Sequence, residues 1–287
     1  MSEPLGRGAG ETKDQLSVAI NNGLLDLIIR STNDFYTKDL MDIGVLGYRT
    51  DQHGNPIVES ALVGPLAGRD FVSIAEIEED ELRLEHRSQL VTDRETGEVR
   101  RLSEELPVWV DGIAEGGTPM CHALLKCHQM ISDWIVEHPD SYPPFVINIT
   151  GSESQDGDPV PYAESVRALE TSDGNVLLFN CHLSGSSPSV SFPAFDRELP
   201  NLRTHVLFDV SSPLPLEFVL MMGLGEIPTP SWNVQPDMRG FAFNADKNSL
   251  ENFLETALWP PRHWHGRRGG STRDQYAHHK DLWAWLA

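Results

Sequence analysis

The sequence predicts an α/β protein with a doubly wound, Rossmann-like, mostly parallel sheet flanked by helices. Two observations predict this class. The apolar runs 144–150 and 175–183 are nearly continuous rather than alternating, as expected for strands that are buried on both faces. Segments with helical periodicity separate such runs along the chain, which is the order found in parallel sheets.

The amino-terminal region begins with a predicted amphipathic helix over 12–30. Thr12 and Gln15 match a capping box, and one helical face is apolar at Leu16, Ala19, Ile20, Leu24, Leu27 and Ile28. The run 42–48 predicts a buried strand. Shorter strands and loops are expected over 56–110, with a hairpin at 91–102.

The clearest helix spans 118–137, because Thr118 suits the N-cap and Pro119 the first helical position. An apolar stripe runs along it at Leu124, Cys127, Ile131 and Trp134. The remaining expected elements are strands at 144–150, 175–183, 204–210 and 240–245 and helices at 160–170, 214–224 and 247–257. Residues 1–257 are therefore interpreted as one domain.

Composition restricts the classes of function. The chain has 287 residues and a formal net charge of -21, which disfavours a nucleic-acid-binding surface. No apolar run approaches the length of a membrane span, and the amino terminus lacks the apolar segment of a secretory signal. Three cysteines without a disulfide-type spacing fit a reducing compartment. We therefore expect a cytoplasmic protein.

Residues 258–287 differ in composition from the rest. They carry a net charge of +3 and four of the seven Trp residues. Because chain termini are ordered only when other parts of the fold hold them, we expect a poorly ordered tail. The alternative is a docking segment anchored by Trp283 and Trp285.

Four segments in order, GGTPM at 116–120, VINITGSESQDGDP at 146–159, SDGNVLLFNCHLS at 172–184 and GFAFNAD at 240–246, resemble the bacterial branch of the von Willebrand factor type A domains. The resemblance implies a Rossmann-like fold and a metal-ion-dependent adhesion site for Mg²⁺. In the family an Asp-x-Ser-x-Ser motif after the first strand, a Thr and a later Asp supply ligands. A partner protein often completes the coordination with a carboxylate.

This chain matches the metal-site pattern only in part. Thr118 matches the family's Thr, whereas Gly151 stands where the second Asp is expected, and Asp-x-Ser-x-Ser is absent. Glu153 and Asp156 lie nearby at positions that do not match. We therefore expect a degenerate site with weak or absent Mg²⁺ binding.

The family's first strand lies in the middle of the sheet, and we expect this chain to lack its equivalent, because the resemblance places the end of that strand just before Met1. Without that strand, neighbouring strands would expose unpaired backbone groups in the core. Three interpretations remain open. The natural protein begins upstream of Met1, the chain is a degenerate product, or a partner chain donates the strand.

The leading hypothesis is a non-enzymatic protein-binding module that contacts its partner near Thr118. The alternative is a metal-dependent hydrolase that uses the carboxylates of loop 151–158 with the cysteine and histidine residues of CHALLKCH and CHL, namely Cys121, His122, Cys127, His128, Cys181 and His182. Zinc favours such ligand types. However, Cys127 belongs to the apolar stripe of a helix, and free cysteine commonly behaves as a buried hydrophobe.

Overall fold

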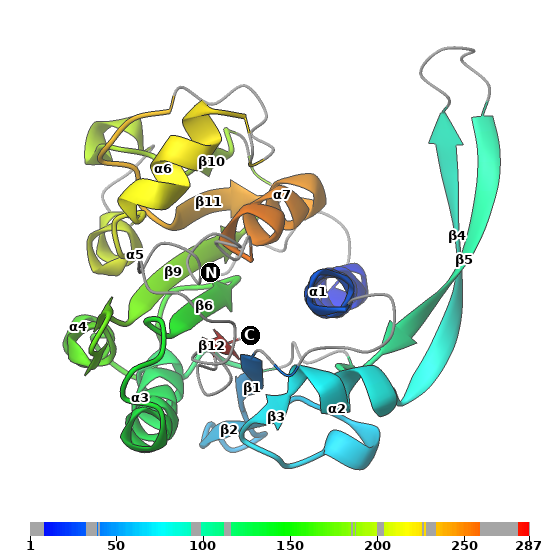
Figure 1. Ribbon diagram of the computed structural model, residues 1–287, viewed down its shortest axis with the longest axis horizontal. Coiled ribbons are helices and arrows are strands. Elements are labelled where there is room, and N and C mark those ends of the chain that lie inside the picture. Colours follow the sequence, from blue (N-terminus) through cyan, green and yellow to red (C-terminus); the bar gives the residue numbers. More distant parts are fainter. Residues whose placement is uncertain are drawn as a thin grey trace, which may run out of the picture.

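The computed structural model describes residues 9–32, 39, 41–92, 99–111, 116–184, 186, 188–199, 204–225, 227, 234–258 and 281–286. These residues form an α/β fold in which helices cover both faces of a central, mostly parallel sheet (Figure 1). The predicted fold class is thus confirmed at the level of a mixed, mostly parallel sheet flanked by helices.

The central sheet has the strand order β10-β11-β9-β6-β12-β1-β2, with β3 also pairing with β1. The five middle strands run parallel, and the strands β10, β2 and β3 pair antiparallel to their neighbours. The strands are β1 (Met41–Thr50), β2 (Pro56–Ser60), β3 (Val72–Ser73), β6 (Phe145–Thr150), β9 (Leu177–Leu183), β10 (Val190–Ser191), β11 (Phe241–Ala245) and β12 (Asp281–Leu286).

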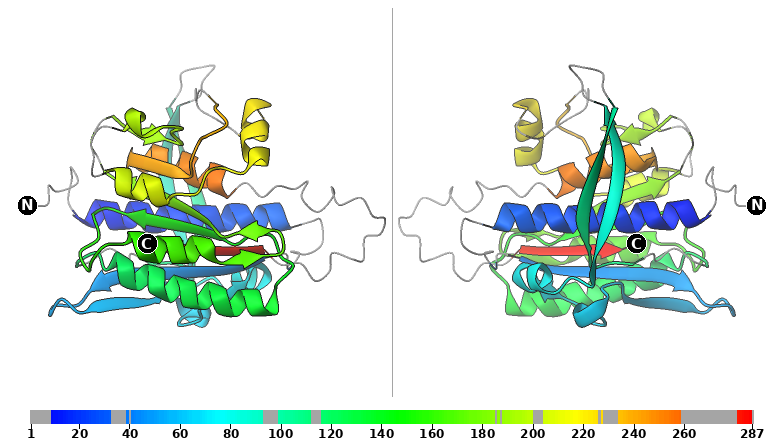
Figure 2. Two further views of the ribbon diagram at one scale, coloured as in Figure 1. Left: turned by 90° about the vertical axis from the view of Figure 1, so that its left-hand side faces the viewer. Right: turned by 90° about the vertical axis from the view of Figure 1, so that its right-hand side faces the viewer.

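An interior position of this sheet, between β6 and β1, is filled by β12, the last strand in the described part of the chain. β12 pairs in parallel with β1 on one side and with β6 on the other. It lies directly beneath α1 (Figure 2). Two expectations are therefore wrong: residues 281–286 are not a poorly ordered tail, and the interior of the sheet does not lack a strand. Residues 259–280 and 287 lie outside the described part of the chain.

The side chains of β12 alternate between two apolar layers, as strand geometry requires. Trp283 and Trp285 face the layer under α1 and α7, whereas Ala284 and Leu286 face the layer under α3 and α4. All four side chains are buried. The alternation of large and small residues in this short segment therefore matches the two faces of the sheet.

The helices on the α1 side are α1 (Ala9–Ser31), α2 (Ile74–Glu79), α6 (Leu216–Gly223) and α7 (Lys247–Ala257), and those on the opposite side are α3 (Met120–Glu137), α4 (Val160–Ala168) and α5 (His205–Val210). The predicted apolar faces of α1 and α3 are buried. Because α1 begins by Ala9, Thr12 lies inside the helix, and the predicted capping box at its start is wrong.

The hairpin predicted around 91–102 is confirmed as β4 (Arg83–Thr92) and β5 (Val99–Val108). Its strands are ten residues each, and together they extend away from the body of the molecule (Figure 1). The remaining short elements are β7 (Glu170–Thr171), β8 (Gly174–Asn175) and two 3₁₀ turns at Gly64–Leu66 and Asp196–Glu198.

One expected strand is a helix. Residues 205–210 form α5, which buries Phe208 and Val210 and leaves Val206 exposed. A short apolar run has no decisive period, so length and tertiary packing decide its conformation. Ser211 then ends the helix and ties it to the sheet, because its hydroxyl accepts a hydrogen bond from the side chain of Asn180 on β9.

Candidate functional site

The carboxyl ends of β1, β6 and β9 meet loop 116–119 and loop 151–159 at one edge of the sheet. The backbone N–H of Gly117 donates to Oγ1 of Thr50, the last residue of β1, at 2.7 Å. A Cβ on Gly116, whose φ is 78°, would lie 2.4 Å from the carbonyl oxygen of Thr50. Both the backbone conformation and the close approach therefore require glycine at this position.

Thr118 lies in loop 116–119 and joins it to loop 151–159. Its carbonyl oxygen accepts hydrogen bonds from the backbone N–H groups of Gln155 and Met120, each at 2.9 Å. The predicted N-cap role of its side chain is wrong. α3 begins at Met120, Pro119 occupies the cap position, and no side-chain hydrogen bond from that position caps the helix.

Asp156 caps α3 instead, from a loop more than thirty residues further along the chain. Its Oδ1 accepts from the backbone N–H of Cys121 and from the hydroxyl of Ser154, at 3.0 and 2.9 Å. Its Oδ2 accepts from the backbone N–H and from Nδ1 of His122, at 3.0 and 2.7 Å. A carboxylate can only accept, so Nδ1 of His122 carries the proton.

The negative charge of Asp156 is stabilised by the groups around it. Burial alone would raise the pKa of this carboxyl, but the hydrogen bonds from His122, from the two backbone N–H groups and from Ser154 outweigh burial and hold the pKa well below its usual value. The positive end of the α3 dipole acts in the same direction. Asp156 therefore belongs to the framework that joins loop 151–158 to α3.

These residues do not fit a Mg²⁺ site. Two donors reach each oxygen of Asp156, which fills its acceptor sites. Glu153 is exposed, and Gly151 has no ligating side chain. Among the residues that the structure describes, no three His, Cys, Asp or Glu side chains are grouped so as to hold a metal.

A pocket of about 350 Å³ opens beside these loops, at the carboxyl ends of β6, β9 and β11. Met120, Leu207 and Phe243 line it with apolar surface, and Glu153 and Asp158 contribute carboxylates. A partner side chain with an apolar stem and a polar or basic end suits such a lining.

His182 also lines this pocket, and its ring stacks on that of Phe243 with centroids 4.8 Å apart. Burial lowers its pKa, which favours the neutral imidazole. Its Nδ1 is buried and has no hydrogen-bond partner among the residues that the structure describes. The pocket thus combines a stacked aromatic wall with one unsatisfied polar atom.

The cysteines proposed for the hydrolase alternative are dispersed and protonated. Burial raises the pKa of Cys127 to about 12 and raises that of Cys181 further still. Sγ of Cys121 lies 3.5 Å from Oγ of Ser154. Because Ser154 gives its only proton to Asp156, the Cys121 thiol must be the donor in that contact, and a thiolate would lose it.

A polar chain inside the core was not found from the sequence. The hydroxyl of Tyr48 donates toward Oδ1 of Asn148 at 3.1 Å, Asn148 donates to Oδ1 of Asn180 at 2.8 Å, and Asn180 donates to Oγ of Ser211 at 2.9 Å. Burial raises the pKa of Tyr48, so it stays a neutral donor. The only sequence signal was an Asn in the middle of each of two apolar runs.

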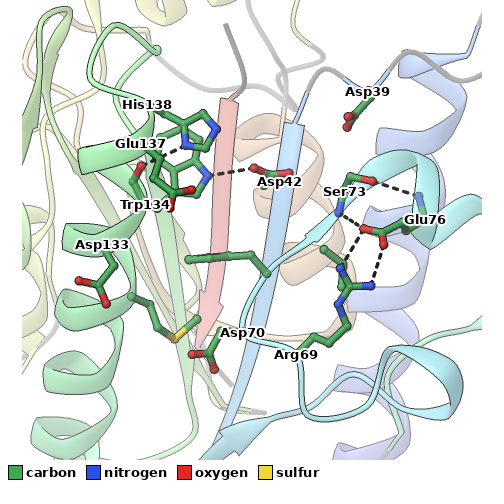
Figure 3. Close-up of a pocket in the computed structure, with 13 residues that line it drawn as sticks. Asp39, Asp42, Arg69, Asp70, Ser73, Glu76, Asp133, Trp134, Glu137 and His138 are labelled. Carbon is green, nitrogen blue, oxygen red and sulfur yellow. Dashed lines mark hydrogen bonds and ion pairs between the residues drawn. The ribbon is translucent and has the colours of Figure 1, made fainter. Parts of the chain in front are cut away.

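A second cavity, of about 520 Å³, lies at the opposite edge of the sheet, where β1 begins and α3 ends (Figure 3). Trp134 forms part of its wall and donates from Nε1 to Oδ2 of Asp42 at 2.9 Å. Arg69 pairs with Glu76, and this contact, with the N-cap bonds of Ser73, lowers the pKa of Glu76 to about 2. The carboxylates of Asp42 and Glu76 therefore serve α3 and α2 locally.

Comparison of the chain with protein-family models, with curated proteins and with solved structures finds no match. The resemblance to the type A domains thus rests on the residues quoted above and on the fold class. None of the helices in the described ranges is long and apolar enough to cross a membrane.

Proposed function

We propose that this protein is a non-enzymatic binding module of the von Willebrand type A class, which recognises a protein partner in the bacterial cytoplasm through the carboxyl edge of its sheet. The observation that carries the proposal is the set of hydrogen bonds that holds loops 116–119 and 151–158 together. Hydrogen bonds to Thr50, Thr118 and Asp156 fix both loops against α3, which presents a preorganised surface to a partner.

Recognition is proposed to proceed without a bridging metal ion. Asp156 is engaged by four donors, and Gly151 offers no ligand. In place of a metal-bound carboxylate, the pocket beside Glu153 takes a side chain of the partner. The carboxylates of Glu153 and Asp158 in its lining favour a basic end on that side chain, because opposite charges across an interface improve specificity and association rate.

Site-specific photocrosslinking tests this proposal in the native cell. A benzoylphenylalanine at Val206, which lines the pocket and is 40% exposed, should crosslink one partner protein. The matched control is the same residue at Val136, which is 78% exposed and lies at the other end of α3; it should not give that product. The Glu153→Lys variant should weaken binding of the purified partner at least tenfold without changing the free energy of unfolding.

Two measurements distinguish the proposal from the hydrolase alternative: partner binding in the presence of a chelator, and assays for enzymatic turnover. Binding of the purified partner should be unchanged by a chelator of divalent ions, and the protein should show no turnover of generic esters or phosphate esters with or without added metal. Stoichiometric zinc retained through purification, or turnover that depends on His122, would favour the hydrolase and contradict the proposal.

A further inference from the structure

The slot between β1 and β6 is shaped for one particular strand. Trp283 stacks on Phe145 of β6 with ring centroids 4.4 Å apart and an interplanar angle of 16°. A Cβ added to Gly23 of α1 would lie 2.6 Å from Cη2 of Trp285, so only a glycine leaves room for that ring. The slot therefore selects an extended segment with two aromatic residues on one face and small or aliphatic residues on the other.

The same slot cannot stay empty in a folded protein. If β12 left, the facing edges of β1 and β6 would expose backbone N–H and C=O groups that β12 pairs over Met41–Leu46 and Phe145–Asn148. Unpaired backbone groups in a core are costly, and facing strand edges bind any matching strand. A molecule whose own β12 is not inserted thus offers a binding site for another copy of β12.

The chain connects β12 to the body through a long segment. Twenty-two residues separate Leu258, after α7, from Asp281 at the start of β12. Fully extended, such a length spans at most about 75 Å. That reach is sufficient for β12 to insert into its own slot or into the slot of a neighbouring molecule.

From these observations we infer that β12 is an exchangeable strand: the slot between β1 and β6 accepts β12 of a second copy of this chain, and two copies form a strand-swapped dimer. Strand exchange preserves every contact of β12, including the stack on Phe145 and the space beside Gly23. The two forms differ only in whether the strand arrives from the same chain or from another, which is the usual energetic basis of domain swapping.

The amount of strand-swapped dimer should depend on protein concentration, because each β12 is also connected to its own chain. A connection of this length gives the attached strand an effective concentration of the order of 1 mM. Exchange between copies therefore competes with self-insertion only when the protein concentration approaches about 1 mM, or when many chains refold together. The dimer is a minor species in dilute solution and rises with concentration.

Paired cysteine variants of the full chain test this inference. Val146 on β6 and Ala284 on β12 are register partners and are both buried. Adjacent strands are about 4.8 Å apart, which suits the spacing that a disulfide needs. The double variant Val146→Cys with Ala284→Cys should form a disulfide within one chain. This variant establishes that β12 occupies its slot.

The two single variants, Val146→Cys and Ala284→Cys, are then mixed, unfolded in urea and refolded together at about 1 mM before oxidation. We expect a disulfide-linked dimer whose bridged peptides contain positions 146 and 284, in an amount that falls on dilution. A Val136→Cys variant, at an exposed position of α3, replaces Val146→Cys as the control and should not give a bridge to position 284.

Two results would overturn the inference. If the double variant bridges within one chain but the mixed single variants give no bridge between positions 146 and 284, β12 does not exchange. If the double variant does not bridge at all, β12 does not occupy the slot. Neither result bears on partner binding at the carboxyl edge, so failure of the inference and failure of the proposed function are distinguishable.

Discussion

Gly23 and Trp285 provide a direct test of the placement of β12. Alanine in place of an interior helical glycine ordinarily stabilises a protein by about 0.5–1 kcal/mol. At Gly23, however, the new Cβ would lie 2.6 Å from Cη2 of Trp285 and 2.8 Å from Cδ1 of Leu258. Overpacking of this kind costs about 1–3 kcal/mol. We therefore expect Gly23→Ala to lower the free energy of unfolding by about 0.5–2 kcal/mol.

A change at Trp285 should reduce the destabilising effect of Gly23→Ala. Phenylalanine lacks the outer ring atoms that approach Gly23, and it also removes an indole N–H that is buried without a hydrogen-bond partner in the described part of the chain. A buried unsatisfied donor costs about 1–3 kcal/mol, which offsets part of the lost packing. In the Trp285→Phe background only the close approach to Leu258 remains, so Gly23→Ala should be less destabilising there, and the two changes should couple by about 1–3 kcal/mol.

Urea unfolding followed by far-ultraviolet circular dichroism measures all four proteins of this cycle. Gly223→Ala is the matched control, because a Cβ at that position of α6 would meet no atom within 4 Å; its effect should be the same in both backgrounds. The reasoning is refuted if Gly23→Ala changes the free energy of unfolding equally with Trp and with Phe at position 285. That result would mean that α1 does not contact the indole.

Three further predictions concern the loops and the core. The side chain of Asn21 accepts from the backbone N–H groups of Trp109 and Val110 and donates to the carbonyl oxygen of Val110, so Asn21→Ala should cost about 2–4 kcal/mol by urea unfolding, whereas Asn22→Ala should change little. Asp156→Ala removes the cap of α3 and should cost about 1–2 kcal/mol. Because the pKa of Asp156 is lowered in the folded state, its stabilising contribution is complete above the unfolded value of about 4 and is lost as the pH falls below it. The difference in stability between the native protein and Asp156→Ala should therefore shrink in acid, and a difference that stays constant from pH 6 into acid would contradict this assignment. Gly151→Asp should not create tight Mg²⁺ binding by calorimetry, since the four hydrogen bonds that Asp156 accepts leave its carboxylate no acceptor site for the metal; binding in the micromolar range would refute that view.

Several elements were predictable because their signals are local. The apolar faces of α1 and α3 repeat at helical spacing over many turns, and the bounds of α7 agree with the predicted range 247–257. The continuous apolar runs at β6 and β9 reflect burial on both faces of the sheet. Periodicity over such lengths is a strong signal, since few other arrangements bury the same residues.

The site was less accessible to prediction because its contacts are not local. Asp156 caps a helix whose first turn precedes it by more than thirty residues, and no spacing rule links the two. Thr118 has the side chain of a good N-cap, but the backbone turns at Pro119 and leaves Thr118 outside the helix. Tertiary packing here overrides a local preference worth only about 1 kcal/mol.

The sequence by itself determined the class of the fold, the faces of its long helices and the strands with continuous apolar runs, because these depend on residue periodicity. Only the tertiary structure decided that residues 205–210 are helical, that Asp156 serves α3, and that residues 281–286 form the strand between β1 and β6. Strand pairing is set by which edges remain open once the rest of the chain has folded. A short segment such as 281–286 carries an alternation of large and small residues but no information about its neighbours, and the open edges of β1 and β6 supply that information.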